Sequence, residues 1–95
     1  MLKTIQVTEN DIKNGRPCNA QECAVARAIA RHLKRGVELI VGRTHIHVGD
    51  SHLKLKTPEA ASDFIQRFDD QPEAQHSPIT FTLDIPSKLL KATAK

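Results

Sequence analysis

The segment 37–56 alternates aliphatic and polar side chains in three successive runs, and this pattern constrains the fold more than any other feature of the chain. Its aliphatic positions are Val37, Leu39, Val41, Ile46, Val48, Leu53 and Leu55. A period of two is typical of a strand with one buried face. The dipeptides Gly42-Arg43 and Gly49-Asp50 interrupt the pattern and suit two-residue hairpin turns. The segment is therefore predicted to form a three-stranded antiparallel meander.

Closing both turns at these dipeptides predicts a pairing register. Val41 would pair with Thr44, and Val48 with Ser51, which places every large aliphatic side chain except Ile40 on one face. A slip of one residue would scatter the aliphatic side chains over both faces. The opposite face would then carry one row of Glu38, His47 and His52 and a second row of Ile40, His45 and Lys54, with Lys56 beyond them.

Two further strands are predicted at the ends of the chain. Residues 3–8 and residues 79–85 each alternate apolar and polar side chains, and Pro78 and Pro86 bound the second run. Thr8, with Asp11 three residues later, predicts a capped helical turn that ends at Gly15.

Two longer helices are predicted, one before and one after the meander in the sequence. For the first, over residues 20–35, Asn19 is the expected N-cap, Glu22 the capping-box partner and Gly36 the stop. The second begins at Thr57-Pro58 and runs to Asp69-Asp70. Its apolar stripe consists of Ala61, Phe64, Ile65 and Phe68.

These elements predict an α+β fold. The chain has 95 residues, which is too few for two hydrophobic cores. We expect one domain over residues 1–86, with an antiparallel sheet of four to five strands that includes the meander and two helices packed on one face. Residues 87–95 are expected to form a flexible C-terminal tail or a short helix.

Charge is distributed unevenly along the chain. Residues 27–56 carry seven basic and two acidic side chains, whereas residues 57–76 carry one basic and five acidic side chains. A basic and an acidic face are therefore expected. The basic stripe of the helix 20–35 consists of Arg27, Arg31, Lys34 and Arg35, and the helix shows no acidic residue on that face. Such a stripe is typical of a solvated helix face, and it also suits an external anion.

The outer face of the meander is the second candidate surface. Three interpretations stay open for its histidines and lysines: a solvated sheet face, a surface that binds an anion or an acidic protein, and a metal site. Together with the helix stripe, the expected partner- or anion-binding residues are Arg27, Arg31, Lys34, Arg35, His45, His47, His52, Lys54 and Lys56. The candidate metal ligands are Glu38, His45, His47 and His52.

Other functional classes find little support in the residues. Cys18 and Cys23 have no second pair to complete a zinc site, and we expect reduced thiols and a cytoplasmic protein. No run approaches the length that crosses a bilayer, and residues 1–15 show no signal-peptide core. Nucleotide-binding and hydrolase motifs are absent, so no enzymatic activity and no cofactor are expected. The sequence has no Trp or Tyr on which bases could stack. Nucleic-acid binding therefore stays possible only through contacts with phosphates.

Several short patterns together resemble a small family of proteins encoded by bacteriophages and prophages. They are Ile5-x-Val7-Thr8-x-x-x-Ile12-x-x-Gly15, Cys23-x-Val25-Ala26, Ile46-x-Val48, Phe64-Ile65-x-x-Phe68-Asp69 and Phe81-x-Leu83. Ala24 stands where that family has proline after the cysteine. The resemblance implies a phage accessory protein that binds and blocks a host component, and it implies no catalytic residue.

The sequence therefore predicts a non-enzymatic binding protein whose partner is an acidic host protein or a phosphate-rich ligand. Sequence-nonspecific nucleic-acid binding is the alternative, and metal binding by the histidines is the third candidate. An unpaired edge strand could also pair two copies into a homodimer.

Overall fold

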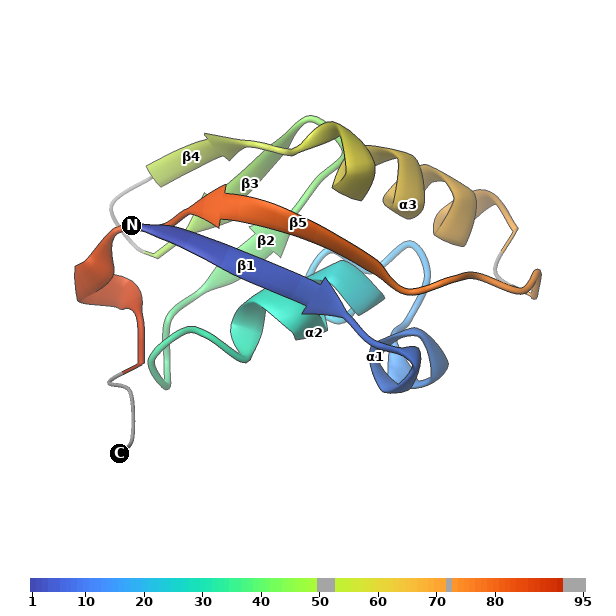
Figure 1. Cartoon of the computed structure of the whole chain (residues 1–95), viewed down its shortest axis with the longest axis horizontal. Coiled ribbons are helices and arrows are strands. Elements are labelled where there is room, and N and C mark those ends of the chain that lie inside the picture. The colour runs from blue at the N-terminus through green and yellow to red at the C-terminus, as the bar shows by residue number, and fades with distance from the viewer. Residues whose placement is uncertain (50–52, 72, 92–95) are drawn as a thin grey trace.

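The computed structural model describes residues 1–49, 53–71 and 73–91 of the chain. The elements within these residues are β1 (Leu2–Val7), α1 (Glu9–Asn14), α2 (Ala24–Ala30), β2 (Leu39–Val41), β3 (His45–Val48), β4 (Leu53–Lys56), α3 (Glu59–Asp70), β5 (Ile79–Asp84) and the 3-10 helix η1 (Ser87–Leu89) (Figure 1). The predicted α+β class with antiparallel strands is confirmed. None of the helices in the described ranges is long and apolar enough to cross a membrane.

The strands form two sheets rather than the one sheet that was predicted. β1 and β5, from opposite ends of the chain, pair antiparallel as a two-stranded ribbon, with Ile5 opposite Phe81. β2, β3 and β4 form the meander as a separate three-stranded sheet. Ile5 and Phe81 are both buried, because the alternation in each strand turns its apolar side chains toward the same core.

The predicted register of the meander is wrong by two residues in both hairpins. Val41 pairs with Ile46, and Val48 pairs with Leu53. Gly42 is part of the first hairpin's pairing, because its N–H donates to the carbonyl oxygen of His45 at 2.9 Å. The turn therefore falls at residues 43–44, one position later than the glycine suggested.

A shift of two residues preserves the side-chain alternation, so the predicted division of the two faces is confirmed for the described residues. Val41, Ile46 and Val48 are buried, whereas Ile40, His47, Lys54 and Lys56 are exposed. The second predicted turn included Asp50, the predicted pairing included Ser51, and the first predicted row included His52. These three residues lie outside the described residues.

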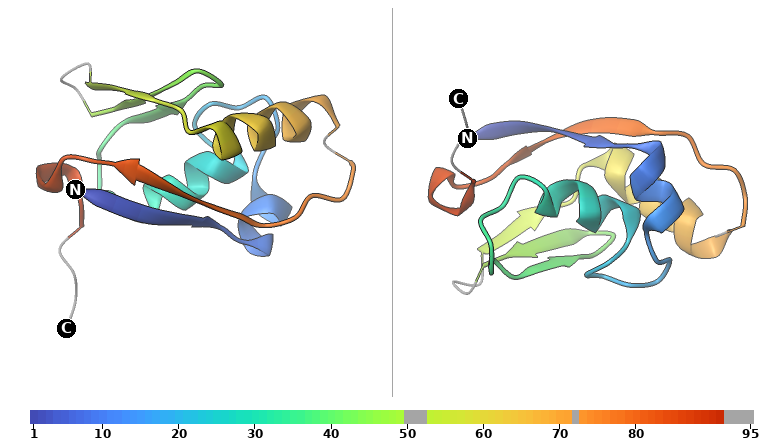
Figure 2. Two further views of the ribbon diagram at one scale, coloured as in Figure 1. Left: turned by 45° about the horizontal axis from the view of Figure 1, so that its top comes forward. Right: turned by 90° about the horizontal axis from the view of Figure 1, so that it is seen from below.

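α2 lies between the ribbon and the three-stranded sheet (Figure 2). Ala24 and Ala28, on the same helix as the predicted basic stripe, are fully buried, whereas Ala30 is exposed. Small alanine side chains on two sides of the helix allow β1 and β2 to pack against it closely. A helix packed from both sides does not show a simple apolar stripe in its sequence.

α2 is also shorter than the predicted helix 20–35. Asn19 caps a separate turn, in which its side-chain oxygen accepts the N–H groups of Gln21 and Glu22, and the N-cap of α2 is Cys23. At the other end, Leu33 forms a bridge with Leu90, and the N–H of Lys34 donates to the carbonyl of Leu89 at 2.9 Å. The N–H groups of residues 31–33 still donate to carbonyls three or four residues earlier, and the long-range bonds take over from Lys34.

The prediction for α1 is confirmed, and that for α3 is confirmed except at its start, which is Glu59 with Pro58 as the N-cap. Thr8 and Asp11 form both hydrogen bonds of a capping box at the start of α1. The apolar stripe of α3 is buried as expected. Thr57 does not cap α3, however, because its hydroxyl donates to the carbonyl of Gly42 at 2.8 Å and so fastens the start of α3 to the first hairpin.

The packed part of the chain extends beyond the boundary expected at residue 86. Ser87–Leu89 forms the 3-10 turn η1, and Leu90 is 7% exposed against the core. The N–H of Lys91 donates to the carbonyl of His32 at 2.9 Å. Residues 87–91 therefore complete the domain at the end of α2.

Candidate functional site

The outer face of the three-stranded sheet gathers imidazole side chains from β3 and lysines from β4 beside an aliphatic side chain from β2. Ile40 on β2, His47 on β3 and Lys54 on β4 stand side by side in one row. His45 and Lys56 form the next pair along the sheet. Side chains opposite each other on paired strands lie about 5 Å apart at Cβ. We call the five residues Ile40, His45, His47, Lys54 and Lys56 the sheet surface.

The sheet surface is accessible. His47, Lys54 and Lys56 are exposed, His45 is half-buried, and the side chain of Ile40 is 38% exposed in spite of its apolar character. The other face of the sheet packs its aliphatic side chains into the core against α2. Among the ion pairs of the described residues, none involves a histidine or lysine of the sheet surface. These cations therefore face solvent.

The corrected register separates the residues that were expected to bind a metal. Glu38 lies opposite Gly49, whose N–H donates to the Glu38 carbonyl at 2.8 Å, instead of beside His47. His45 and His47 are each paired with a lysine on β4. In the described part of the chain, no three His, Cys, Asp or Glu side chains are placed to hold a metal ion. His52, the fourth candidate, lies outside that part.

Arg27 and Arg31 do not present the uncompensated charge that the sequence suggested. Asp11, on α1, is fully buried, and its carboxylate accepts two hydrogen bonds from Arg31, at 3.1 and 2.6 Å. The Nε of Arg27 lies 3.8 Å from the same carboxylate. The expectation that no acidic residue faces this basic stripe is therefore wrong, and the two arginines join α2 to α1.

Opposing effects act on the Asp11 carboxyl. Burial acts to raise its pKa, but the hydrogen bonds from Arg31 and from the N–H of Thr8, together with the charge of Arg31, outweigh burial, and the pKa is lowered. The pKa of Arg31 is raised in turn, mainly by its hydrogen bonds to Asp11. The pair is ionised at neutral pH and has a structural role.

Lys34 and Arg35 are exposed and follow the end of α2, outside the helix in which they were predicted. Gly36, with φ +85°, then turns the chain toward β2. Both cations lie in the connection between α2 and the sheet. They are available to a partner but stand apart from the two arginines that hold Asp11.

Both cysteines line a second concave region, a cavity of about 330 Å³ between the start of α2, β2 and α3. Cys18 is exposed and has φ +57°, a left-handed conformation that its N–H stabilises by donating to the Asp69 carboxylate at 2.7 Å. Cys23 is buried, and burial raises the pKa of its thiol. The Cys23 thiol therefore stays protonated and acts as the helix cap.

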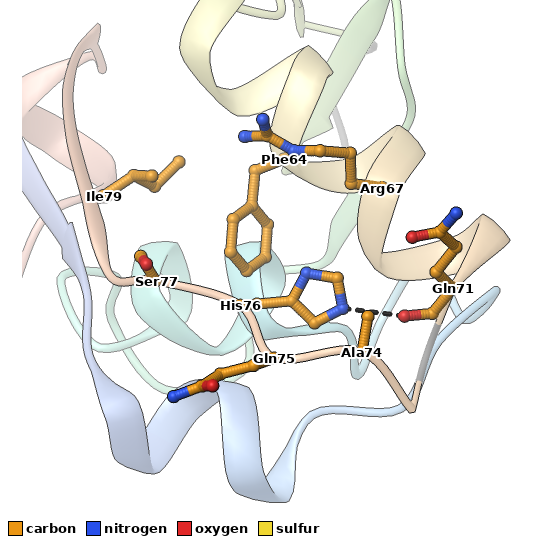
Figure 3. Close-up of a pocket in the computed structure, with 8 residues that line it drawn as sticks. All are labelled: Phe64, Arg67, Gln71, Ala74, Gln75, His76, Ser77 and Ile79. Atoms are coloured by element: carbon orange, nitrogen blue, oxygen red, sulfur yellow. Dashed lines mark hydrogen bonds between the residues drawn. The ribbon is translucent and has the colours of Figure 1, made fainter.

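Another cavity, of about 240 Å³, lies between α3 and the segment that leads into β5 (Figure 3). His76 forms one wall, and its Nε2 lies 2.8 Å from the carbonyl oxygen of Gln71. The imidazole ring also packs edge-on against Phe68 and beside Phe64. His76 thus fixes the loop after α3 on the aromatic core, a role that no pattern in the sequence indicated.

Comparison with known protein families, with curated proteins and with solved structures gave no match for this chain. The evidence for the candidate site therefore comes from its geometry. Sequence reasoning identified the residues of the sheet surface from their alternation. It missed the partnership of Asp11 with Arg31, because twenty residues separate the two and Asp11 already satisfied a local capping pattern.

Proposed function

We propose that this protein is a small, non-enzymatic binding protein whose sheet surface docks onto an acidic surface of another protein. The observation that carries the proposal is the row of Ile40, His47 and Lys54, which crosses three strands and is exposed on all of them. A row that combines an exposed aliphatic side chain, an imidazole and an ammonium group offers both apolar contact and charge complementarity. His45 and Lys56 extend the same surface by one row.

A protein partner fits this surface better than a nucleic acid does. Phe64, Phe68 and Phe81 are all buried in the core, and the sequence has no other aromatic side chain apart from histidine. The described part of the surface thus lacks a stacking platform for bases. Contact with phosphates alone remains the alternative function, and it would be strongly weakened by salt.

The resemblance to phage-encoded proteins extends this proposal. The partner would be a component of the host cell, and binding would block that component. A protein of this size achieves such inhibition by covering a surface, since it needs no catalytic site of its own. Lys34 and Arg35, in the connection before β2, would add charge at the margin of the contact.

Affinity capture with matched charge variants tests the proposal. The tagged protein and its Lys54→Glu/Lys56→Glu variant are used to capture partners from the host, with and without nuclease. Reversed charges against an acidic surface cost several kcal/mol, so the affinity should fall more than about tenfold. Lys13→Glu/Lys88→Glu, which reverses two exposed lysines outside the sheet surface, is the control.

The expected result is an acidic protein that the wild type and the control capture equally and that the sheet variant loses, with no effect of nuclease. Equal capture by both double variants would exclude the sheet surface as the binding site. Capture that disappears on nuclease treatment would replace the protein partner by nucleic acid.

A further inference from the structure

A small cavity of about 160 Å³ lies beside β1, and none of the sheet-surface residues lines it. Thr4, Gln6 and Thr8 line it from β1 and from the residue that follows, because they alternate with the buried Ile5 and Val7. Arg31 and His32, from the end of α2, complete its walls. No acidic side chain lines the cavity.

The lining residues are rich in hydrogen-bond donors. Three N–H groups of Arg31 are used, two by Asp11 and one by the carbonyl of Gln6, which leaves two of the five that a guanidinium carries. The Thr8 hydroxyl oxygen accepts the N–H of Asp11, so its proton can be donated elsewhere. The Thr4 hydroxyl and the Gln6 amide are exposed at the same opening.

Positive charge surrounds the imidazole in this cavity. Burial lowers the pKa of His32, and the charges of Lys3 on β1, of Arg31 and of Lys91 after η1 lower it further. The three cations come from three separate parts of the chain. Their convergence disfavours a fourth positive charge and favours an anion.

We propose that this cavity binds a single phosphate group, as inorganic phosphate or as the end of a small phosphomonoester. A cavity of this volume has room for roughly five waters, which suits a tetrahedral oxyanion and is below the range of about 300–1,000 Å³ typical for larger ligands. Phosphate oxygens accept from guanidinium, hydroxyl and imidazole donors.

The proposed phosphate site is independent of the proposed docking function. It shares no residue with the sheet surface, and its Arg31 is held in position by Asp11. A bound dianion would offset the positive potential that Lys3, Arg31 and Lys91 place at His32, and would favour the protonated imidazole. Binding should therefore raise the pKa of His32.

Histidine NMR of the full-length protein tests this proposal. Inorganic phosphate and glycerol phosphate are titrated separately at constant ionic strength, with chloride as the matched control. The His32 resonances should shift with saturation, and its pKa should rise, while the His47 and His76 resonances stay unchanged. Equal affinity for the two probes would indicate recognition of the phosphate alone, and tighter binding of the ester would indicate recognition of its organic part.

Two variants connect the signal to the cavity. Thr4→Val removes one lining hydroxyl from an exposed strand position, and its loss should weaken phosphate binding about tenfold, as expected for a hydrogen bond to a charged group. Lys13→Gln is the charge control and should bind normally. His32→Gln, followed by calorimetry, should also lose affinity while its melting temperature shows that it is folded.

Identical His32 shifts with chloride and phosphate would overturn the proposal, and so would unchanged phosphate affinity in both Thr4→Val and His32→Gln. A short oligonucleotide that displaced phosphate at far lower concentration would assign the cavity to nucleic acid instead. A failure of the sheet-surface variants would leave these titrations unaffected, so the two proposals can fail separately.

Discussion

At the scale of single residues, Asp11 is the residue on which the α1–α2 contact depends most. It is the one fully buried acidic side chain among the described residues, and the half-exposed guanidinium of Arg31 is its main partner. Removing one partner of a buried pair leaves an uncompensated charge. The reverse-charge change Arg31→Glu, which the sequence alone would recommend as a test of partner binding, would therefore disturb the fold first.

Replacing Arg31→Gln should lower the free energy of unfolding at pH 7 by about 2 kcal/mol, less than for a fully buried pair because the Arg31 side chain is 47% exposed. Arg27→Gln should cost less than about 1 kcal/mol, because Arg27 approaches the carboxylate only to 3.8 Å and is partly exposed. Urea denaturation of the two variants measures the difference. Equal losses would contradict the assignment of Arg31 as the main partner.

The lowered pKa of Asp11 makes the stability depend on acid in a defined direction. A carboxyl whose folded-state pKa lies below its unfolded value of 3.8 stabilises the fold above that value, and the contribution is lost as the pH falls through the folded-state pKa. Wild-type protein should consequently lose stability below about pH 4. Thermal unfolding of wild type and Asp11→Asn between neutral and acid pH should converge, whereas a constant difference would contradict this role.

At the scale of elements, Gly15 shows how a contact between two helices depends on one missing side chain. A Cβ at this position would lie 2.5 Å from the backbone nitrogen of Ala24 and 2.7 Å from the carbonyl oxygen of Asp11. The end of α1 can thus approach the start of α2 only if residue 15 is glycine. Its φ of −72° is ordinary, so steric contact and not backbone conformation imposes the requirement.

Gly15→Ala should therefore destabilise the protein by about 3 kcal/mol, as overpacking against rigid backbone does. Gly36→Ala is the matched control: its φ of +85° imposes about 1 kcal/mol of strain, but a Cβ there meets no atom within 4 Å. Thermal unfolding gives the order of the two losses. A larger loss for Gly36→Ala would show that the α1–α2 approach is less tight than described.

Local signals predicted the elements, and long-range contacts decided what local signals could not. The capping box at Thr8 and the stripe of α3 depend on neighbours in the sequence, and both predictions are confirmed. The first hairpin turn depends on Gly42, whose carbonyl oxygen accepts a hydrogen bond from the Thr57 hydroxyl at the start of α3. The end of α2 depends on Leu90, far along the chain. No pattern in the local sequence indicates either contact.

The sheet surface could be predicted because a register error of two residues does not change which face a side chain occupies. His47 and Lys54 share a face in either register, although they pair with each other only in the observed one. The metal-site hypothesis required particular side chains to lie directly opposite each other on adjacent strands. Such pairs change with any shift of the register. Predictions of a face are consequently more robust than predictions of a cluster.

At the scale of the whole molecule, the acidic segment and the basic segment of the chain form different elements. The segment with five acidic side chains forms α3 and the loop after it, whereas Lys54 and Lys56 lie on the sheet surface and Lys34 and Arg35 in the connection before β2. An acidic partner would therefore be attracted to one side of the protein and repelled from another. Its association should slow as salt is added.

Lysine footprinting of the complex with the captured partner tests the central proposal most directly. Free protein and complex are acetylated under the same conditions, and the modification of each lysine is quantified by mass spectrometry. Lys54 and Lys56 should be protected in the complex, while the exposed Lys13 and Lys88 react as in the free protein. Unchanged reactivity of Lys54 and Lys56, with protection elsewhere, would show that the partner binds another surface.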